Sequence, residues 1–189
     1  TGFIIFNRQT YPNLTALFEL LKVPTQVSNM SFAVSMDDGT LEYSGTSLGG
    51  LFGQRRNLFR PRFWSMLADL VRFYRHAARD AGGICERMSL GDYLTHGQYG
   101  SAFRDDHLLP MAGAIWSAPP TEILSYPAAS FIRFNDNHGL LSMWQRPAWE
   151  TVTGGSRNYV SRLIENFEGD IRLDTGVMAV RRTGDGVFV

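Results

Sequence analysis

The residues whose side chains could do chemistry are scattered along the sequence. Its four histidines include no His-x-x-x-His pair of the kind that binds zinc (His76, His96, His107 and His138). The single cysteine, Cys85, cannot form an internal disulfide or a zinc site by itself. The glycines between residues 45 and 53 fit neither a dinucleotide-binding loop nor a phosphate-binding loop. Residue chemistry alone therefore indicates no catalytic group.

Two carboxylates and an imidazole stand side by side at Asp105, Asp106 and His107. Adjacent residues on a helix point in different directions, so these side chains are not expected to converge on one reacting atom. We therefore expect a solvated helix face here rather than a catalytic group.

A glycine turn between a strand and a helix is the next candidate. Gly154 and Gly155 are followed by Ser156 and by the basic Arg157. Free amides at the start of a helix attract anions, and glycine lets a ligand approach closely. A turn capped by serine explains the same residues without any ligand, and this structural interpretation is preferred.

Arginines are concentrated in one region and continue along one helix face (Arg55, Arg56, Arg60, Arg62, Arg72, Arg75 and Arg79). A basic amphipathic helix can lie on an anionic lipid surface. Asp69 and Asp80 supply counter-charges on the same face. We favour a solvated face on a buried helix, and peripheral lipid contact stays open as the alternative.

Among the elements that must position these residues, the clearest is a helix that begins near Pro61 and ends at Gly82 and Gly83. Ten apolar residues from Phe63 to Ala78, Trp64 among them, fall on one half of its helical wheel. Ser89 and Asp92 form a variant capping box before a short helix. A long helix over residues 101–116 should be kinked at Pro110, which lacks a backbone donor.

Turn signals and alternation predict the remaining elements. We expect a helix over residues 12–21 opened by Thr10 as its cap, with later helices at 121–124, 127–137 and 157–167. Strands are expected at 149–152 and 171–173, with hairpins at 31–44 and 177–189. The sequence therefore predicts an α+β fold with a helix-rich middle over residues 55–140 and β-rich ends.

Composition restricts the class of protein. Of the 189 residues, 44% are apolar, which excludes disorder over most of the chain. The 18 basic and 18 acidic residues leave no basic excess for binding nucleic acid. No apolar run approaches the ~20 residues of a membrane span. One cysteine and no signal peptide fit the cytoplasm.

Both ends of the sequence lie within strand-like runs. The chain opens with Thr1, Gly2 and Phe3 before further apolar residues, and it closes on Val187 to Val189 just after a hairpin signal. We therefore expect an interior piece of a longer protein.

The closing residues carry a family resemblance. The run WETVTGGS (149–156), a helix, and the run IRLDTGVMAVRR (171–182) resemble the flavin-containing amine oxidase superfamily. The opening TGF and YPNL (11–14) look like the stretch that follows the flavin loop of that family. Between them, LLPMA (108–112), IWSAPP (115–120), NHGLL (137–141) and RPAW (146–149) look like a bacterial branch of FAD-dependent or NAD/FAD-binding proteins.

The resemblance implies a substrate-binding domain with a mixed β-sheet and a helical layer. It places Gly2 and Phe3 near the flavin ring, Val177 at the adenine, and Gly154 and Gly155 in the turn toward the cofactor domain. It makes Trp116, His138, Arg146 and Trp149 candidates to line the substrate pocket, with no chemical role assigned.

The implied function is that of an FAD-dependent oxidoreductase acting on a small molecule, with hydride passing from a C–H bond of an amine or apolar, lipid-like substrate to flavin. The family's dinucleotide fingerprint is missing, and the sole lysine, Lys22, does not match the lysine that many members place near flavin. We therefore expect residues 1–189 to bind FAD weakly or not at all and to be inactive alone. The alternative is a non-catalytic binding module or an anionic-lipid surface module that uses the basic face from Arg55 to Arg79.

Overall fold

The computed structural model describes residues 5–45, 47–142, 147–165 and 167–189, and it shows an α+β chain. The helices are α1 (Pro12–Leu20), α2 (Leu48–Leu51), α3 (Pro61–Asp80), α4 (Leu90–His96), α5 (Ser101–Phe103), α6 (Leu109–Trp116), α7 (Pro120–Ser125), α8 (Ala128–Asn137) and α9 (Arg157–Glu165). Tighter or wider helical turns lie at η1 (Arg55–Phe59), η2 (Ile84–Arg87) and η3 (Arg104–Leu108).

The described strands form separate two-stranded antiparallel sheets. They are β1 (Thr25–Ser28) with β4 (Trp149–Val152), β2 (Ala33–Met36) with β3 (Leu41–Ser44), and β5 (Arg181–Thr183) with β6 (Gly186–Phe188). The expected mixed sheet is therefore not what these residues form. Each strand has three or four residues and one partner, and two of the pairs close over their own turns.

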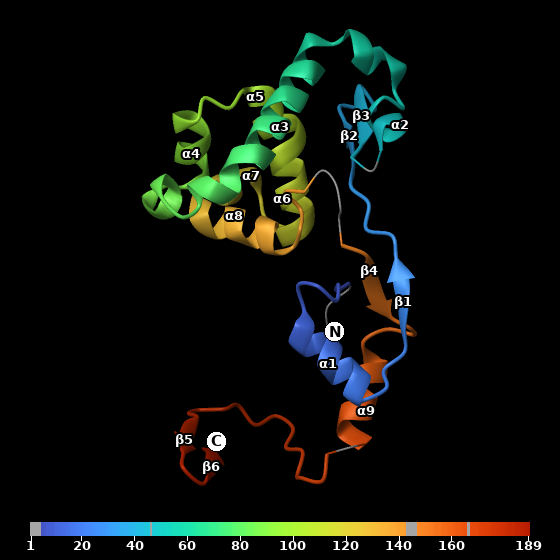
Figure 1. Cartoon of the computed structure of the whole chain (residues 1–189), viewed down its shortest axis with the longest axis vertical. Helices are drawn as coiled ribbons and strands as arrows, with labels where there is room; N and C mark the ends of the chain where they lie inside the picture. Colours follow the sequence, from blue (N-terminus) through green and yellow to red (C-terminus); the bar gives the residue numbers. More distant parts are fainter. Residues whose placement is uncertain (1–4, 46, 143–146, 166) are drawn as a thin grey trace.

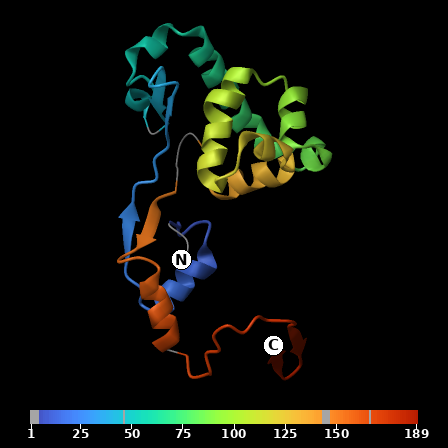
Figure 2. The ribbon, with the colours of Figure 1, turned by 180° about the vertical axis from the view of Figure 1, so that it is seen from behind.

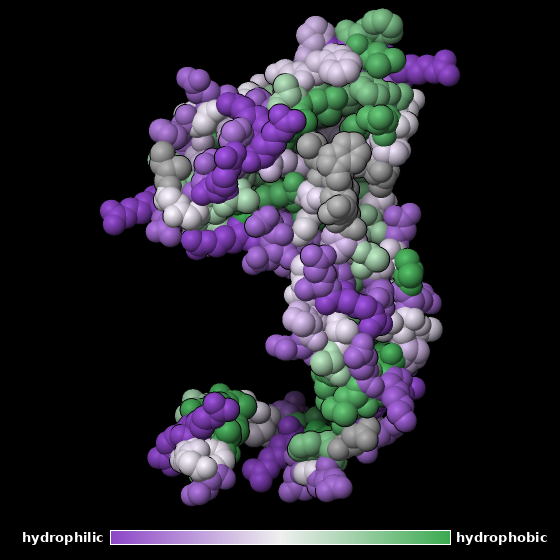
Figure 3. Space-filling view, viewed as in Figure 1, coloured by the Kyte–Doolittle hydropathy of each residue, from purple (hydrophilic) through white to green (hydrophobic). Residues whose placement is uncertain are grey.

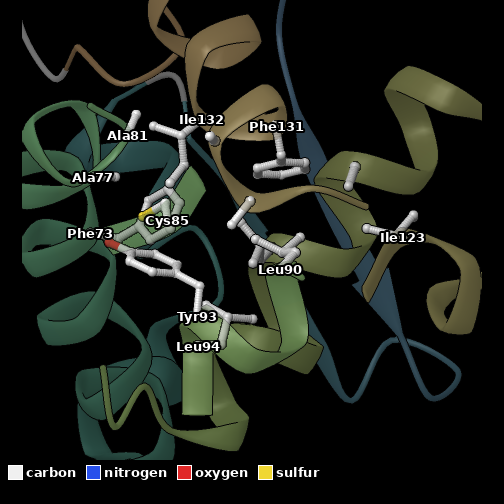
Figure 4. Close-up of a cluster of buried hydrophobic side chains, with 14 of the residues drawn as sticks. Phe73, Ala77, Ala81, Cys85, Leu90, Tyr93, Leu94, Ile123, Phe131 and Ile132 are labelled. Carbon is white, nitrogen blue, oxygen red and sulfur yellow. The ribbon is translucent and has the colours of Figure 1, made fainter. Parts of the chain in front are cut away.

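Figure 1 shows the helices α3 to α8 gathered into one body, from which β1 and β4 lead to α1 and α9. The C-terminal hairpin lies away from this body, and the view from behind in Figure 2 agrees. The largest buried cluster fills the helical body, where Phe73, Ala77, Tyr93, Phe131 and Ile132 converge (Figure 4). Burial of apolar side chains is the main force that holds such a body together.

Helix α3 confirms the strongest prediction from the sequence. Its buried residues Phe63, Met66, Phe73 and Ala77 recur at helical spacing. The expectation that Trp64 would share this buried face was wrong, because its indole donates a hydrogen bond to the Leu58 carbonyl (2.9 Å) at the exposed end of the helix.

The predicted Ser89 cap at the start of α4 is confirmed, although the Asp92 carboxylate bonds the Ser89 hydroxyl and not the Ser89 backbone N–H of a full capping box. The Ser89 hydroxyl accepts the backbone N–H of Asp92 at 3.1 Å, and it donates to the Asp92 carboxylate at 2.7 Å. The expected Thr10 cap of α1 was wrong, since Tyr11 occupies the cap position and gives no side-chain hydrogen bond to the helix.

The expected long helix over residues 101–116 is interrupted as Pro110 predicts. A π-helical turn, η3, separates α5 from α6, and Pro110 lies in the first turn of α6. A π-helical turn is rare, and where one interrupts an α-helix it is frequently at a functional site.

Of the strands predicted beyond α9, the structure contains only the closing hairpin. Residues 171–173 form no strand, and of 177–182 only Arg181 and Arg182 belong to β5. The side chains from 167 to 189 are exposed, so no packing surface fixes the rest of this segment as a strand.

Within the described residues, no helix is long and apolar enough to cross a membrane.

Candidate functional site

An apolar cavity of about 240 Å³ lies where the helical body meets the strands. Among the residues that line it are Phe32, Tyr74, His107, Met111, Leu140 and Trp149. An engineered apolar cavity of about 150 Å³ holds benzene. This cavity therefore has room for one ring with a short side chain.

Six separate segments of the chain line the cavity, if η3 and α6 are counted as one continuous segment and Gly45 and the turn at Gly139 are included. Tyr74 comes from α3, His107 from the π-helical turn η3, and Met111 from α6. Phe32 lies between β1 and β2, and Trp149 opens β4. His107 and Met111 are one helical turn apart, but the other residues are far apart in the sequence, so periodicity within single elements could not have brought them all together.

The turn after α8 adds the remaining wall. Gly139 has φ +67°, which an L side chain rarely adopts, and a Cβ there would lie 2.8 Å from the Pro147 ring. Glycine is therefore required for the chain to pass Pro147 and place Leu140 at the cavity.

The polar part of the wall depends on Pro110. Because proline has no backbone N–H, it cannot bond the carbonyl of Asp106 four residues earlier. The Tyr43 hydroxyl donates to that carbonyl at 2.8 Å and also lies 2.9 Å from His107 Nδ1. A residue of β3 thus meets the hydrogen-bonding need of an interrupted helix.

This arrangement assigns the tautomer of His107. The Tyr43 proton goes to the Asp106 carbonyl, so the Tyr43 oxygen accepts from Nδ1–H of the imidazole. In the neutral ring the lone pair is then on Nε2. Burial, followed by the negative charge of Asp106, raises the pKa of Tyr43 far above its ordinary value, so the hydroxyl stays protonated.

Aromatic rings fix the plane of the imidazole. His107 stacks on Phe103 with ring centres 6.0 Å apart, and Phe32 meets it edge to face at 5.7 Å. A ring held by hydrogen bond and by stacking is pre-organised against the cavity that it lines.

The expected solvated face at residues 105–107 was wrong for two of its three members. Asp106 and His107 are buried, and Asp106 receives two hydrogen bonds from Arg62, at 2.7 and 2.8 Å. The hydrogen bond to Asp106 raises the pKa of Arg62. The π-helical turn changes the register of the helix and turns these side chains inward. Only Asp105 behaves as expected, paired with its neighbour Arg104 at the surface.

A serine in a motif that sequence reasoning missed has a structural role. Residues 45–49 read G-x-S-x-G between a strand and a helix, which is the spacing of a hydrolase nucleophile turn. Ser47 has an extended backbone with φ −159°, and its hydroxyl accepts the N–H of Gly50 at 3.0 Å. It therefore caps α2.

Cys85 is buried, which raises its pKa to about 11 and keeps the thiol protonated.

The four candidate pocket residues have different environments. Trp149 lines the cavity. Trp116 packs on Phe131 and Phe134 outside its lining. His138 stacks on Phe134 and lies 2.7 Å from the Tyr11 hydroxyl, so it links α8 to α1. Arg146 is outside the described residues.

The candidate flavin-binding residues do not form a cradle. Gly154 (φ +76°) and Gly155 (φ +87°) make the turn before α9, and a Cβ on Gly155 would meet only open space. Val177 is exposed on the extended segment beyond α9. Gly2 and Phe3 are outside the described residues. The described members of this set therefore lie in an open turn and in an exposed irregular segment, and they do not by themselves fit a dinucleotide.

The arginines of the basic face bind mainly to the fold. Arg72 pairs with Asp69 at 2.8 Å and lies over the Tyr99 ring at 4.1 Å. Arg79 donates to the Arg75 carbonyl. Of the two expected counter-charges, Asp69 pairs with an arginine of this face, whereas Asp80 accepts a hydrogen bond from the Tyr93 hydroxyl. Arg75 and Arg79 are exposed, as a solvated face requires.

No protein-family model matches the chain, and no curated protein matches it either. The likeness to flavin-containing amine oxidases therefore remains a resemblance carried by the quoted segments. The cavity, with His107 and Trp149 in its wall, is the feature from which function has to be argued.

Proposed function

We propose that this chain is the substrate-binding part of an FAD-dependent oxidoreductase that resembles the flavin-containing amine oxidases. The substrate would be a small amine or apolar molecule that loses a hydride from a C–H bond. The observation that carries the proposal is the apolar cavity at the junction of helices and strands. Clefts of this kind, with a few fixed polar groups, are the usual sites of small ligands.

The walls of the cavity suit a ring with one polar end. Phe32, Tyr74 and Trp149 supply aromatic surface, and Met111 supplies an adaptable apolar contact. His107 supplies the oriented polar group. These residues bind and orient a ligand and exclude water from it, while bound flavin would supply the redox chemistry and would be held largely by residues other than those described here.

The alternative of a module that binds through the whole basic face from Arg55 to Arg79 receives less support. Arg62 and Arg72 are in ion pairs with Asp106 and Asp69. Charges engaged in this way contribute less to the attraction of an external surface. That alternative also gives the cavity no role in binding.

The test of the proposed function uses a variant that obstructs the cavity. Ala114 is exposed and lines the cavity, so Ala114→Phe should obstruct its mouth without disturbing the core. We expect phenylethylamine, measured by titration calorimetry, to bind the unsubstituted protein and to bind this variant at least about tenfold more weakly.

The matched control is Ala68→Phe, which adds the same side chain at an exposed position of α3. It should bind phenylethylamine as the unsubstituted protein does. Equal binding by the Ala114→Phe variant, or no binding by the unsubstituted protein, would contradict the assignment of the cavity as a substrate site.

A further inference from the structure

Large apolar side chains that have no part in the cavity are exposed on α2, on η1 and at the start of α3. Phe59 is 86% exposed and Leu48 is 76% exposed, and Leu58 and Trp64 are exposed nearby. We call residues 47–64 the tip. Figure 3 shows hydrophobic surface gathered at this end of the molecule, beside protruding hydrophilic side chains.

The tip is an ordered surface. Trp64 donates its indole N–H to the Leu58 carbonyl at 2.9 Å, and its ring centre lies 5.5 Å from that of Phe52. The backbone N–H of Phe52 bonds the Leu48 carbonyl at 3.1 Å. The exposed side chains are therefore presented from a fixed backbone.

The charge of this region is one-sided. Residues 43–68 contain four arginines and no Asp or Glu, although the whole chain has equal numbers of basic and acidic residues. Among the described residues, Arg62 pairs with Asp106, whereas Arg55, Arg56 and Arg60 have no carboxylate partner. The tip thus combines apolar groups with three unneutralised guanidinium groups.

Two of these guanidinium groups donate hydrogen bonds to neutral backbone carbonyls of the neighbouring hairpin, so their positive charge is not paired there. Arg56 donates to the Gly39 carbonyl, and Arg60 donates to the Thr40 carbonyl at 2.6 Å. This turn also holds Asp37 and Asp38, and the exposed Glu42 lies beside it, so three carboxylates next to the tip oppose its attraction for anions.

We propose that the tip docks on the surface of an anionic lipid bilayer. Phe59, Leu58 and Trp64 would enter the boundary between head groups and acyl chains, and the arginines would contact lipid phosphates. Aromatic and basic side chains together are typical of residues at that boundary. Because the tip lies at one end of the molecule (Figure 1), a flat surface can reach it. The proposal is independent of the cavity and of any reaction there.

The experiment is sedimentation of the purified protein with vesicles of phosphatidylcholine alone or mixed with phosphatidylserine. We expect binding to the phosphatidylserine vesicles that weakens as salt rises. Phe59→Ala with Arg55→Gln should weaken it at least about tenfold, since one apolar anchor and one charge are lost. Leu20→Ala with Arg75→Gln, which changes exposed residues elsewhere, should leave it unchanged.

A gain-of-binding variant guards against a loss caused by misfolding. Asp37→Asn with Asp38→Asn removes two negative charges, and Asn tolerates the positive φ of 49° and 51° at these positions. It should bind at least about threefold more tightly. The proposal is overturned if both vesicles bind equally, if neither binds, or if the tip variants bind as the unsubstituted protein does.

Discussion

At the scale of single residues, the most informative contact is the hydrogen bond that the Tyr43 hydroxyl donates to the Asp106 carbonyl. Pro110 leaves the Asp106 carbonyl without its helical partner, and Tyr43 fills the place from β3. The sequence predicted the break at Pro110 correctly. It could not predict Tyr43, because the partner comes from 63 positions away in the chain and only tertiary structure brings it near.

Substitution of Tyr43 tests this contact. Tyr43→Phe keeps the ring and leaves a buried carbonyl without its donor, so we expect a loss of about 1–3 kcal/mol in the free energy of unfolding. Urea denaturation measures it. Tyr126→Phe, on a half-buried tyrosine whose ring packs on Trp116, should cost less. Equal losses would show that the Tyr43 hydroxyl has no special role.

Glu150 gives the pH dependence at this scale. Hydrogen bonds from Arg8 (2.6 Å) and Thr25 (2.6 Å) lower its pKa. A carboxyl whose pKa is lower in the folded state stabilises the protein above its unfolded pKa of about 4.3, and that contribution is lost as the pH falls through the folded value.

We therefore expect Glu150→Gln to unfold more readily than the unsubstituted protein at neutral pH, with the difference disappearing in acid below about pH 4. Thermal unfolding followed by circular dichroism across this range measures it. The exposed Glu19, which also contacts Arg8, is the matched control, and Glu19→Gln should show a smaller difference. A difference that persists unchanged in acid would contradict this origin.

At the scale of elements, helices with local signals were predicted well and strands less so. The signals for α3 and α8 are local: Pro61 and the apolar spacing for α3, and the glycine that follows α8. Both of these helices lie where they were expected. Strand pairing depends on partners elsewhere in the chain. Residues 171–173 have strand-forming side chains but no partner among the described residues, and they remain irregular. The buried Asp106 and His107 were missed because the π-helical turn shifts the helical period there.

The Ser89 cap supplies the test for a single element. Ser89→Ala removes the hydroxyl that accepts the Asp92 N–H, and we expect a loss of about 1 kcal/mol in the free energy of unfolding. Chemical denaturation measures it. Ser65→Ala, within α3 and exposed, should change stability by less than about 0.5 kcal/mol, and a cap that proved no more costly than this control would contradict the assigned role.

At the scale of the whole molecule, the pattern of expected helices and strands predicted the α+β class of fold, whereas the cavity is formed only when these elements assemble. Of the candidate site residues, Trp149 was singled out from a segment that resembles a flavoprotein, whereas His107 was considered and set aside. The missing information was the arrangement of six separate segments around one space, which no single stretch of sequence contains.

Flavin binding is the property to measure at this scale. Because the described candidate residues lie in an open turn and in an exposed irregular segment, we expect residues 1–189 to retain FAD at far below one molecule per chain after desalting. Flavin absorbance of the desalted protein measures this. Retention near one molecule per chain would contradict it and would require a cradle different from the one that the resemblance implies.

The pairing of β1 with β4 has a consequence for engineering. Ser28 lies directly opposite Trp149, so the chain departs and re-enters at neighbouring points on one ribbon. Everything between them is topologically an insertion between two adjacent strands. A two-residue reverse turn could join those strands in its place. The segment between Ser28 and Trp149, which contains the helical body, could then be transferred to another protein, because its two ends lie next to each other.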